Sequence, residues 1–209
     1  MTNQDIITNT VRGQYEGYKQ EIKVNPNSLT ETYTFLKLFI ENNRWHGVPI
    51  NLRTGKKLTG KVTSIIISFK EKGHRLLENF WDKPTPNHIT LQIQPNEGIG
   101  IQLAVKKPGL TTEIEPVNME FCYKTSFDKP QPDAYERLLM DIILGDQTLF
   151  LGKVAESWKF IDPIRNVWDS GKPKLHTYKP GSWGPVEADH ILARDNYYWL
   201  APILTVCKI

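Results

Sequence analysis

Six short segments in the first two thirds of the chain alternate β-branched or aromatic residues with polar ones, which is the period of a β-strand. They are residues 30–41, 47–54, 61–70, 87–95, 98–107 and 115–124. Turn-forming pairs such as Thr59-Gly60 separate them. No helical pattern joins one strand to the next, which favours antiparallel pairing over parallel strands linked by helices. The sequence therefore predicts a largely antiparallel sheet of six or more strands.

The last third of the chain has the period of a helix. Residues 135–143 place apolar side chains at helical spacing, so this helix is expected to bury one face. A second helix is expected from about Lys153, with Pro163 kinking or breaking it, and a third begins at Pro185. Strands followed by helices predict an α+β fold, with the helices packed on one face of the sheet. The other face is left for a second subunit or another domain to cover.

Charge and composition exclude several classes of partner. The formal net charge of +3 over 209 residues is too mild for a general nucleic-acid binder. The two cysteines lack CxxC spacing and a neighbouring histidine cluster, so we expect no metal site. No stretch reaches the roughly 18 apolar residues of a membrane span, and residues 1–20 are too polar for a signal peptide. We therefore expect a cytoplasmic location, with no nucleic-acid or membrane partner.

The segment RTGKKLTGK, from Arg53 to Lys61, carries four positive charges in nine residues. Residues 42–70 contain no Asp or Glu to balance them. Two interpretations stay open on these residues alone. Lys56 and Lys61, beside glycines that let the backbone approach closely, could bind a small anion such as a phosphate ester. The segment could equally be a solvated surface hairpin whose charges keep the protein in solution.

Other candidate site residues are weaker signals. Gln94 ends a predicted strand, where it is either a solvated residue or an amide that contacts a sugar hydroxyl. The chain contains no Walker-type loop, no complete dinucleotide fingerprint, no GxSxG turn and no HExxH pair. The sequence patterns alone therefore show no complete catalytic apparatus.

Six motifs follow one another along the chain: VRGQY, RWHGVPINLRTGKKL, IQPNEGI, DAYERLLMDIILGDQTLF, WKFIDPI and YKPGSWGPVEAD. In this order they resemble the C-terminal half of glucose-6-phosphate dehydrogenase, from about Val11 to Asp195. In that family this half is a β+α domain, and the exposed face of its sheet forms the dimer interface. The resemblance implies a homo-oligomer, with a dimer formed through the sheet face. It also implies that residues 1–30 are a remnant and linker after an N-terminal dinucleotide-binding domain, and that residues 31–209 are the C-terminal domain.

The resemblance also implies a role for the basic segment. The family's GK(R/x)L motif carries a lysine, and a basic residue five positions later, that bind the phosphate of the substrate; these match Lys56 and Lys61. The family's glutamine at the QP strand end matches Gln94 as a substrate contact, and Arg53 is expected to position the loop or a neighbouring phosphate. The implied reaction oxidises glucose 6-phosphate with NADP to 6-phosphogluconolactone and NADPH, in the oxidative pentose phosphate pathway.

The chain lacks several motifs of the family pattern. The glycine-rich coenzyme turn and the helix with the histidine general base have no counterpart, so we expect no catalytic residue and no coenzyme on this chain. NADP would belong to the full-length enzyme, and this chain alone is expected to be inactive. Basic residues of the structural NADP site of some eukaryotic members are also replaced, so we expect no such site; the replacements are Val62, Ile66, Gln92 and Trp183.

Two function classes follow from this comparison. Met1 lies close to the family's domain junction, which favours a truncated form or separate domain of the dehydrogenase. The alternative is a standalone, non-catalytic module that binds phosphosugars or regulates dehydrogenase subunits.

Overall fold

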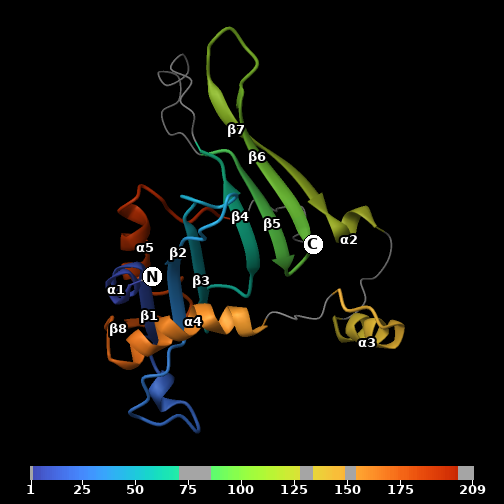
Figure 1. Cartoon of the computed structure of the whole chain (residues 1–209). Helices are drawn as coiled ribbons and strands as arrows, with labels where there is room; N and C mark the ends of the chain where they lie inside the picture. Colours follow the sequence, from blue (N-terminus) through green and yellow to red (C-terminus); the bar gives the residue numbers. More distant parts are fainter. Residues whose placement is uncertain (1, 71–85, 128–133, 149–153, 202–209) are drawn as a thin grey trace. The chain divides into compact units, whose positions relative to one another are not determined.

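The computed structural model describes residues 2–70, 86–127, 134–148 and 154–201 (Figure 1). Its elements are α1 (Asn3–Asn9), β1 (Thr10–Tyr15), a 3-10 helix η1 (Tyr18–Gln20), β2 (Tyr33–Leu38), β3 (Ile50–Gly55), β4 (Thr63–Ser68), β5 (His88–Gln94), β6 (Gly98–Lys106), β7 (Ile114–Cys122), α2 (Tyr123–Ser126), α3 (Ala134–Leu144), α4 (Val154–Asp169), β8 (Leu175–Tyr178) and α5 (Val186–Ala193). The chain divides into two compact units, the first made of residues 1–60 and 140–199 and the second of residues 61–139 and 200–209.

The expected α+β class and mostly antiparallel pairing are confirmed. The strands form two sheets of four, in the orders β3-β2-β1-β8 and β4-β5-β6-β7, rather than one sheet of six or more. Every neighbouring pair is antiparallel except β1 and β8, which are parallel. The chain leaves the strand conformation between β3 and β4, where Lys57 adopts a left-handed φ of 49°. No ladder pairs β3 with β4 among the described residues, so the sheet is divided there.

Helices pack on both faces of the first sheet, which differs from the expected single covered face. On one face Val11, Tyr33 and Phe35 pack with Ile191 of α5 and its neighbours. On the other, apolar residues of α1, β2 and α4 form a second cluster, whose buried members are Ile6, Leu36, Leu38, Ile164, Val167 and Trp168. The reason lies in β2, because the consecutive apolar residues Phe35 and Leu36 point to opposite faces of a strand.

β1 and β8 are the two strands that the sequence patterns did not predict. All six residues of β1 are buried, although Arg12 and Gln14 are polar. Arg12 donates to the Pro173 carbonyl over 2.8 Å and pairs with Glu31 over 2.9 Å. The Gln14 amide donates to two backbone carbonyls, so both side chains are satisfied inside the unit. The domain boundary expected at residue 30 stays a prediction; β1 and β2, on either side of it, pair in one sheet.

The helices expected near the end of the chain are present. α4 continues through Pro163 without a break, and the expected start at Lys153 lies outside the described residues. Burial of Ile164, Val167 and Trp168 supports the half of α4 that follows the proline. α3 forms as predicted, but most of its apolar side chains are exposed rather than buried, with Ile143 79% exposed. None of the described helices is both long and apolar enough to cross a membrane.

The second sheet carries an exposed apolar face. Residues directly opposite one another in antiparallel ladders share a face of the sheet. Two such rows run across all four strands: Ile65, Leu91, Ile99 and Phe121 in the first, and Ile67, Ile89, Ile101 and Met119 in the second. Five of these eight residues, here called the apolar face, are between 36% and 53% exposed. On the opposite face Thr90 is completely buried, so the more apolar face is the one in solvent.

Gly184 makes a close approach that no other residue type could make. Its φ is +107°, and a Cβ built on it would lie 2.1 Å from Cε2 of Tyr33. Tyr33 is 2% exposed and packs against Tyr178 with ring centroids 5.5 Å apart, so its ring cannot move aside freely. The segment after β8 can therefore lie against the core only with glycine at position 184.

We expect Gly184→Ala to lower the free energy of unfolding by about 3 kcal/mol or more, since backbone strain and overpacking add. Gly17→Ala is the matched control, because Gly17 has a similar φ of +90° but nothing within 4 Å of the added Cβ. Its loss should be about 1–2 kcal/mol, the left-handed penalty alone. Urea unfolding followed by circular dichroism measures both, and equal losses would contradict this account of Gly184.

Candidate functional site

The basic loop that follows β3 is held by backbone contacts to distant segments of the first unit. The Lys56 amide donates to the Thr32 carbonyl over 2.8 Å, and the Gly181 amide donates to the Lys57 carbonyl over 2.8 Å. Thr59 donates twice, from its amide to the Ser182 carbonyl over 3.1 Å and from Oγ1 to the Gly181 carbonyl over 2.8 Å. Residues 55–60, here called the lysine loop, are therefore a shaped turn rather than a free hairpin.

The two adjacent lysines of this loop have different environments. The Lys57 ammonium binds Glu21 and lies 4.5 Å from the centroid of the Tyr15 ring. The hydrogen bond that Lys57 donates to Glu21 raises the pKa of Lys57, and the same bond lowers the pKa of Glu21. The Lys56 side chain is exposed, and within the described residues its ammonium has no hydrogen-bond or ion-pair partner. Lys56 is thus the cation of the pair that is available to an anion.

Arg53 lies inside an aromatic sandwich instead of facing an open phosphate position. Its guanidinium carbon lies 4.6 Å from the Trp183 ring centroid and 4.0 Å from the Trp199 ring centroid. Burial is the main cause that lowers the pKa of Arg53, and it raises the pKa of Tyr33 nearby. Arg53 sits on β3 three residues before Lys56, so its stacking fixes the strand from which the lysine loop emerges.

Lys61 and Gln94 belong to the second unit. Lys61 is exposed and precedes β4, whose first residue, Thr63, is paired with Gln94 at the end of β5. The Gln94 side chain is also exposed, and the backbone carbonyl of Gln94 accepts a 3.1 Å hydrogen bond from Nε2 of Gln92. The four predicted site residues therefore fall in two pairs, Arg53 with Lys56 in the first unit and Lys61 with Gln94 in the second.

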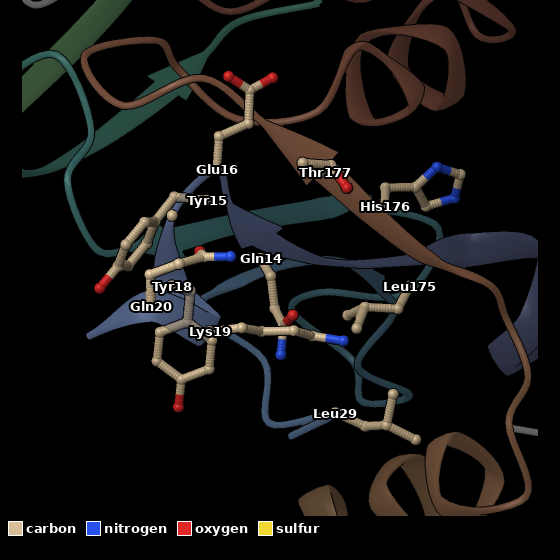
Figure 2. Close-up of a pocket in the computed structure, with 11 residues that line it drawn as sticks. Gln14, Tyr15, Glu16, Tyr18, Lys19, Gln20, Leu29, Leu175, His176 and Thr177 are labelled. Atoms are coloured by element: carbon tan, nitrogen blue, oxygen red, sulfur yellow. The ribbon is translucent and has the colours of Figure 1, made fainter. Parts of the chain in front are cut away.

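A cavity of about 470 Å³ opens in the first unit beside the ends of β1 and β8 (Figure 2). Its lining includes Gln14, Lys19 and His176, of which His176 Nδ1 lies 2.9 Å from Oε1 of Glu187. None of the four predicted substrate residues lines it. The described residues contain no cluster of three His, Cys, Asp or Glu side chains that could hold a metal ion.

Two of the positions expected to replace basic residues of the structural NADP site make contacts within the fold. Trp183 stacks on Arg53, and the Gln92 amide donates to the carbonyls of Gln94 and Pro95. Tyr178 begins the motif YKPGSWGPVEAD, but sequence patterns did not predict its contacts with Thr32 and Lys56, which span 146 and 122 positions. The Pro-Gly turn that follows Tyr178 predicts a loop there, not a contact with the basic segment.

Comparison with known proteins identifies the family. The model of "Glucose-6-phosphate dehydrogenase, C-terminal domain" matches residues 1–200. The chain belongs to this family. The glucose-6-phosphate 1-dehydrogenase of Chlamydia trachomatis serovar D is 42% identical over 204 residues, which cover 90% of this chain and 46% of that enzyme. The enzyme of Bacillus subtilis strain 168 is 38% identical over 201 residues, covering 90% and 41% respectively.

Solved structures agree with this assignment. The Mycobacterium avium glucose-6-phosphate 1-dehydrogenase superposes with a TM-score of 0.78 at 34% identity, covering 95% of this chain and 41% of that one. A glucose-6-phosphate dehydrogenase in complex with its substrate glucose 6-phosphate superposes with a TM-score of 0.83 at 27% identity, covering 96% and 42%. The chain thus spans less than half the length of these relatives, and the expected family is confirmed.

We expect Arg53→Ala to lower the free energy of unfolding by about 2–4 kcal/mol, because it removes two desolvated cation–π contacts and the packing of the side chain. Arg44→Ala is the control, since Arg44 is exposed and its side chain makes no hydrogen bond, ion pair or ring contact within the described residues. Urea unfolding followed by tryptophan fluorescence measures both changes. A loss at Arg53 no larger than that at Arg44 would show that the sandwich adds nothing.

Proposed function

We propose that this chain supplies substrate-phosphate contacts and a subunit interface to an NADP-dependent glucose-6-phosphate dehydrogenase. In this proposal the longer enzyme oxidises glucose 6-phosphate to 6-phosphogluconolactone, and NADP binds to its dinucleotide domain rather than to this chain. The cytoplasmic location inferred from the sequence belongs to the same proposal. Family membership supports it, together with one observation: Lys56 is an exposed cation with no ion-pair partner among the described residues, on a loop fixed by the fold.

Each predicted site residue has a role in the proposal. The ammonium groups of Lys56 and Lys61 contact the substrate phosphate through charge-assisted hydrogen bonds. Gln94 contacts a sugar hydroxyl with its exposed amide. Arg53, stacked between two indole rings, positions the strand end instead of contacting the phosphate. A relative solved with glucose 6-phosphate supports the choice of ligand.

We expect glucose 6-phosphate to raise the melting temperature of this chain, because a ligand that binds only the native state stabilises it. Lys56→Ala with Lys61→Ala should abolish the shift, since each charge-assisted bond contributes about 1.5–3 kcal/mol, or roughly tenfold or more in affinity. Lys57→Asn is the matched control. It removes one charge from the same loop, keeps a residue that tolerates a left-handed φ, and should leave the shift in place.

Glucose and inorganic phosphate serve as the ligand controls in this titration. An equal rise in melting temperature with phosphate alone would show that the site binds anions in general and does not recognise the sugar. A shift lost equally in Lys57→Asn would contradict the assignment to Lys56, because it would report only the charge of the loop. No shift at millimolar glucose 6-phosphate would contradict a preformed site on this chain.

We propose further that the apolar face of the second sheet packs against a second copy of this chain. Two rows of apolar side chains across four strands form an exposed patch that water solvates poorly. A stable interface buries about 800 Å² on each partner, a size that a four-stranded face can supply. A second copy presents the same apolar face, so the two faces can pack against each other.

We expect Met119→Lys to weaken self-association by roughly a hundredfold or more, because the interface would then bury an unpaired charge. Asn118→Lys is the control, since it adds the same charge to the same strand on the opposite face. Sedimentation equilibrium of both variants and the unchanged chain gives the dissociation constants. A chain that stays monomeric at high concentration, or equal effects of the two variants, would contradict the dimer.

A further inference from the structure

We propose that Tyr178 is a positioning residue for the substrate phosphate, acting by fixing the backbone from which Lys56 extends. This inference rests on the proposed function, because it deepens the role assigned to Lys56. Tyr178 does not itself reach the ligand in this account. Its hydroxyl sets where the lysine ammonium can lie.

The hydroxyl of Tyr178 joins three segments of the first unit. It lies 2.8 Å from the Lys56 carbonyl, 3.0 Å from the Thr32 carbonyl and 3.0 Å from Oγ1 of Thr32. A phenol has one proton, so the two carbonyls share it while the Thr32 hydroxyl can donate to the phenol oxygen. The Lys56 carbonyl is the nearer acceptor. β8, the start of β2 and the first turn of the lysine loop thus meet at one oxygen atom.

Because Tyr178 is buried, the hydrogen bonds of its hydroxyl have a large effect on the conformation of the loop. Tyr178 is 3% exposed, and its ring packs edge to face against Tyr15, with centroids 6.3 Å apart. Burial also raises the pKa of Tyr178, so the phenol stays protonated and able to donate. Without this hydroxyl the partly buried contact at the Lys56 carbonyl is lost, so the loop would rearrange to find another partner. The backbone of Lys56 is therefore held most firmly while this hydroxyl is present.

The residues after Tyr178 also hydrogen-bond to the lysine loop. Gly181 and Ser182 exchange three hydrogen bonds with Lys57 and Thr59. Together with Tyr178 they hold the backbone at positions 56, 57 and 59 from one segment of chain. The loop is therefore shaped before any ligand arrives, which reduces the ordering cost of binding.

The same arrangement separates the two adjacent lysines. With the backbone held, Lys57 takes its left-handed conformation, and its ammonium reaches Glu21. The Lys56 ammonium is left unpaired within the described residues. The backbone conformation of the loop therefore makes Lys56, not Lys57, the lysine that binds the phosphate. Tyr178 fixes that conformation at Lys56.

The test is isothermal titration of this chain with glucose 6-phosphate, comparing the unchanged protein with Tyr178→Phe. Titrations are run where circular dichroism shows each variant to be fully folded, so that stability alone cannot change the dissociation constant. We expect Tyr178→Phe to weaken binding by about tenfold, the effect of one lost hydrogen bond to the loop. Tyr33→Phe is the matched control. It deletes a hydroxyl from the same core cluster, but that hydroxyl has no partner within the described part of the chain.

A double-mutant cycle distinguishes positioning from general damage. In the Lys56→Ala background, Tyr178→Phe should have no further effect on binding, since the positioned group is gone. Equal losses in both backgrounds, or equal effects of Tyr178→Phe and Tyr33→Phe, would overturn the inference.

A second readout keeps the inference testable if the unchanged chain does not bind glucose 6-phosphate, a result that would contradict the proposed function. The amide resonances of Lys57 and Gly181 report the loop in ligand-free protein. Tyr178→Phe should shift or broaden them, while Tyr33→Phe should leave them in place. Resonances that do not respond to Tyr178→Phe would overturn the positioning role independently of any ligand.

Discussion

The hydrogen bonds of the Tyr178 hydroxyl link the strand that ends the first sheet to the loop that carries Lys56. They are possible because β8 pairs in parallel with β1, which places Tyr178 opposite Tyr15 in the register. The segment after β8 then contacts the lysine loop through Gly181 and Ser182 and passes close to Tyr33 at Gly184. Loss of the β1–β8 pairing would therefore release the loop as well as the sheet edge. The candidate site depends on the core of the first unit, not on the loop sequence alone.

The fold, rather than the composition, decides which positive charges in and beside the lysine loop stay available to a ligand. Lys57 is neutralised by Glu21, and the Arg53 guanidinium is enclosed between Trp183 and Trp199. Lys56, five positions before Lys61, keeps an exposed ammonium. The segment carries four positive charges in sequence, but fewer of them are left available to an anion, and these have fixed positions. Directed charge discriminates a phosphate ester from bulk counterions better than a diffuse basic surface does.

The sequence predicted β2 to β7 and missed β1 and β8. β4 to β7 have one apolar face and were recognisable, whereas β1 is buried on both sides and carries Arg12 and Gln14, whose partners lie in other segments. β8 has only four residues and no periodic signal. Lys56 was predicted as a site residue from a local motif. Tyr178 lies in another motif, but its contact with Lys56 was not predicted, because a hydroxyl contact across 122 positions leaves no local pattern. The same limit hid the stacking of Arg53.

Hydrogen exchange of the ligand-free chain tests most directly whether the fold shapes the lysine loop in advance. The amides of Lys56, Thr59 and Gly181 each donate to a backbone carbonyl of another segment. If these bonds are held by the core, the three amides should exchange nearly as slowly as those of β2, although the side chains around them are exposed. Exchange at the rate of an unprotected loop would contradict the account, because Lys56 would then be a cation on a free hairpin.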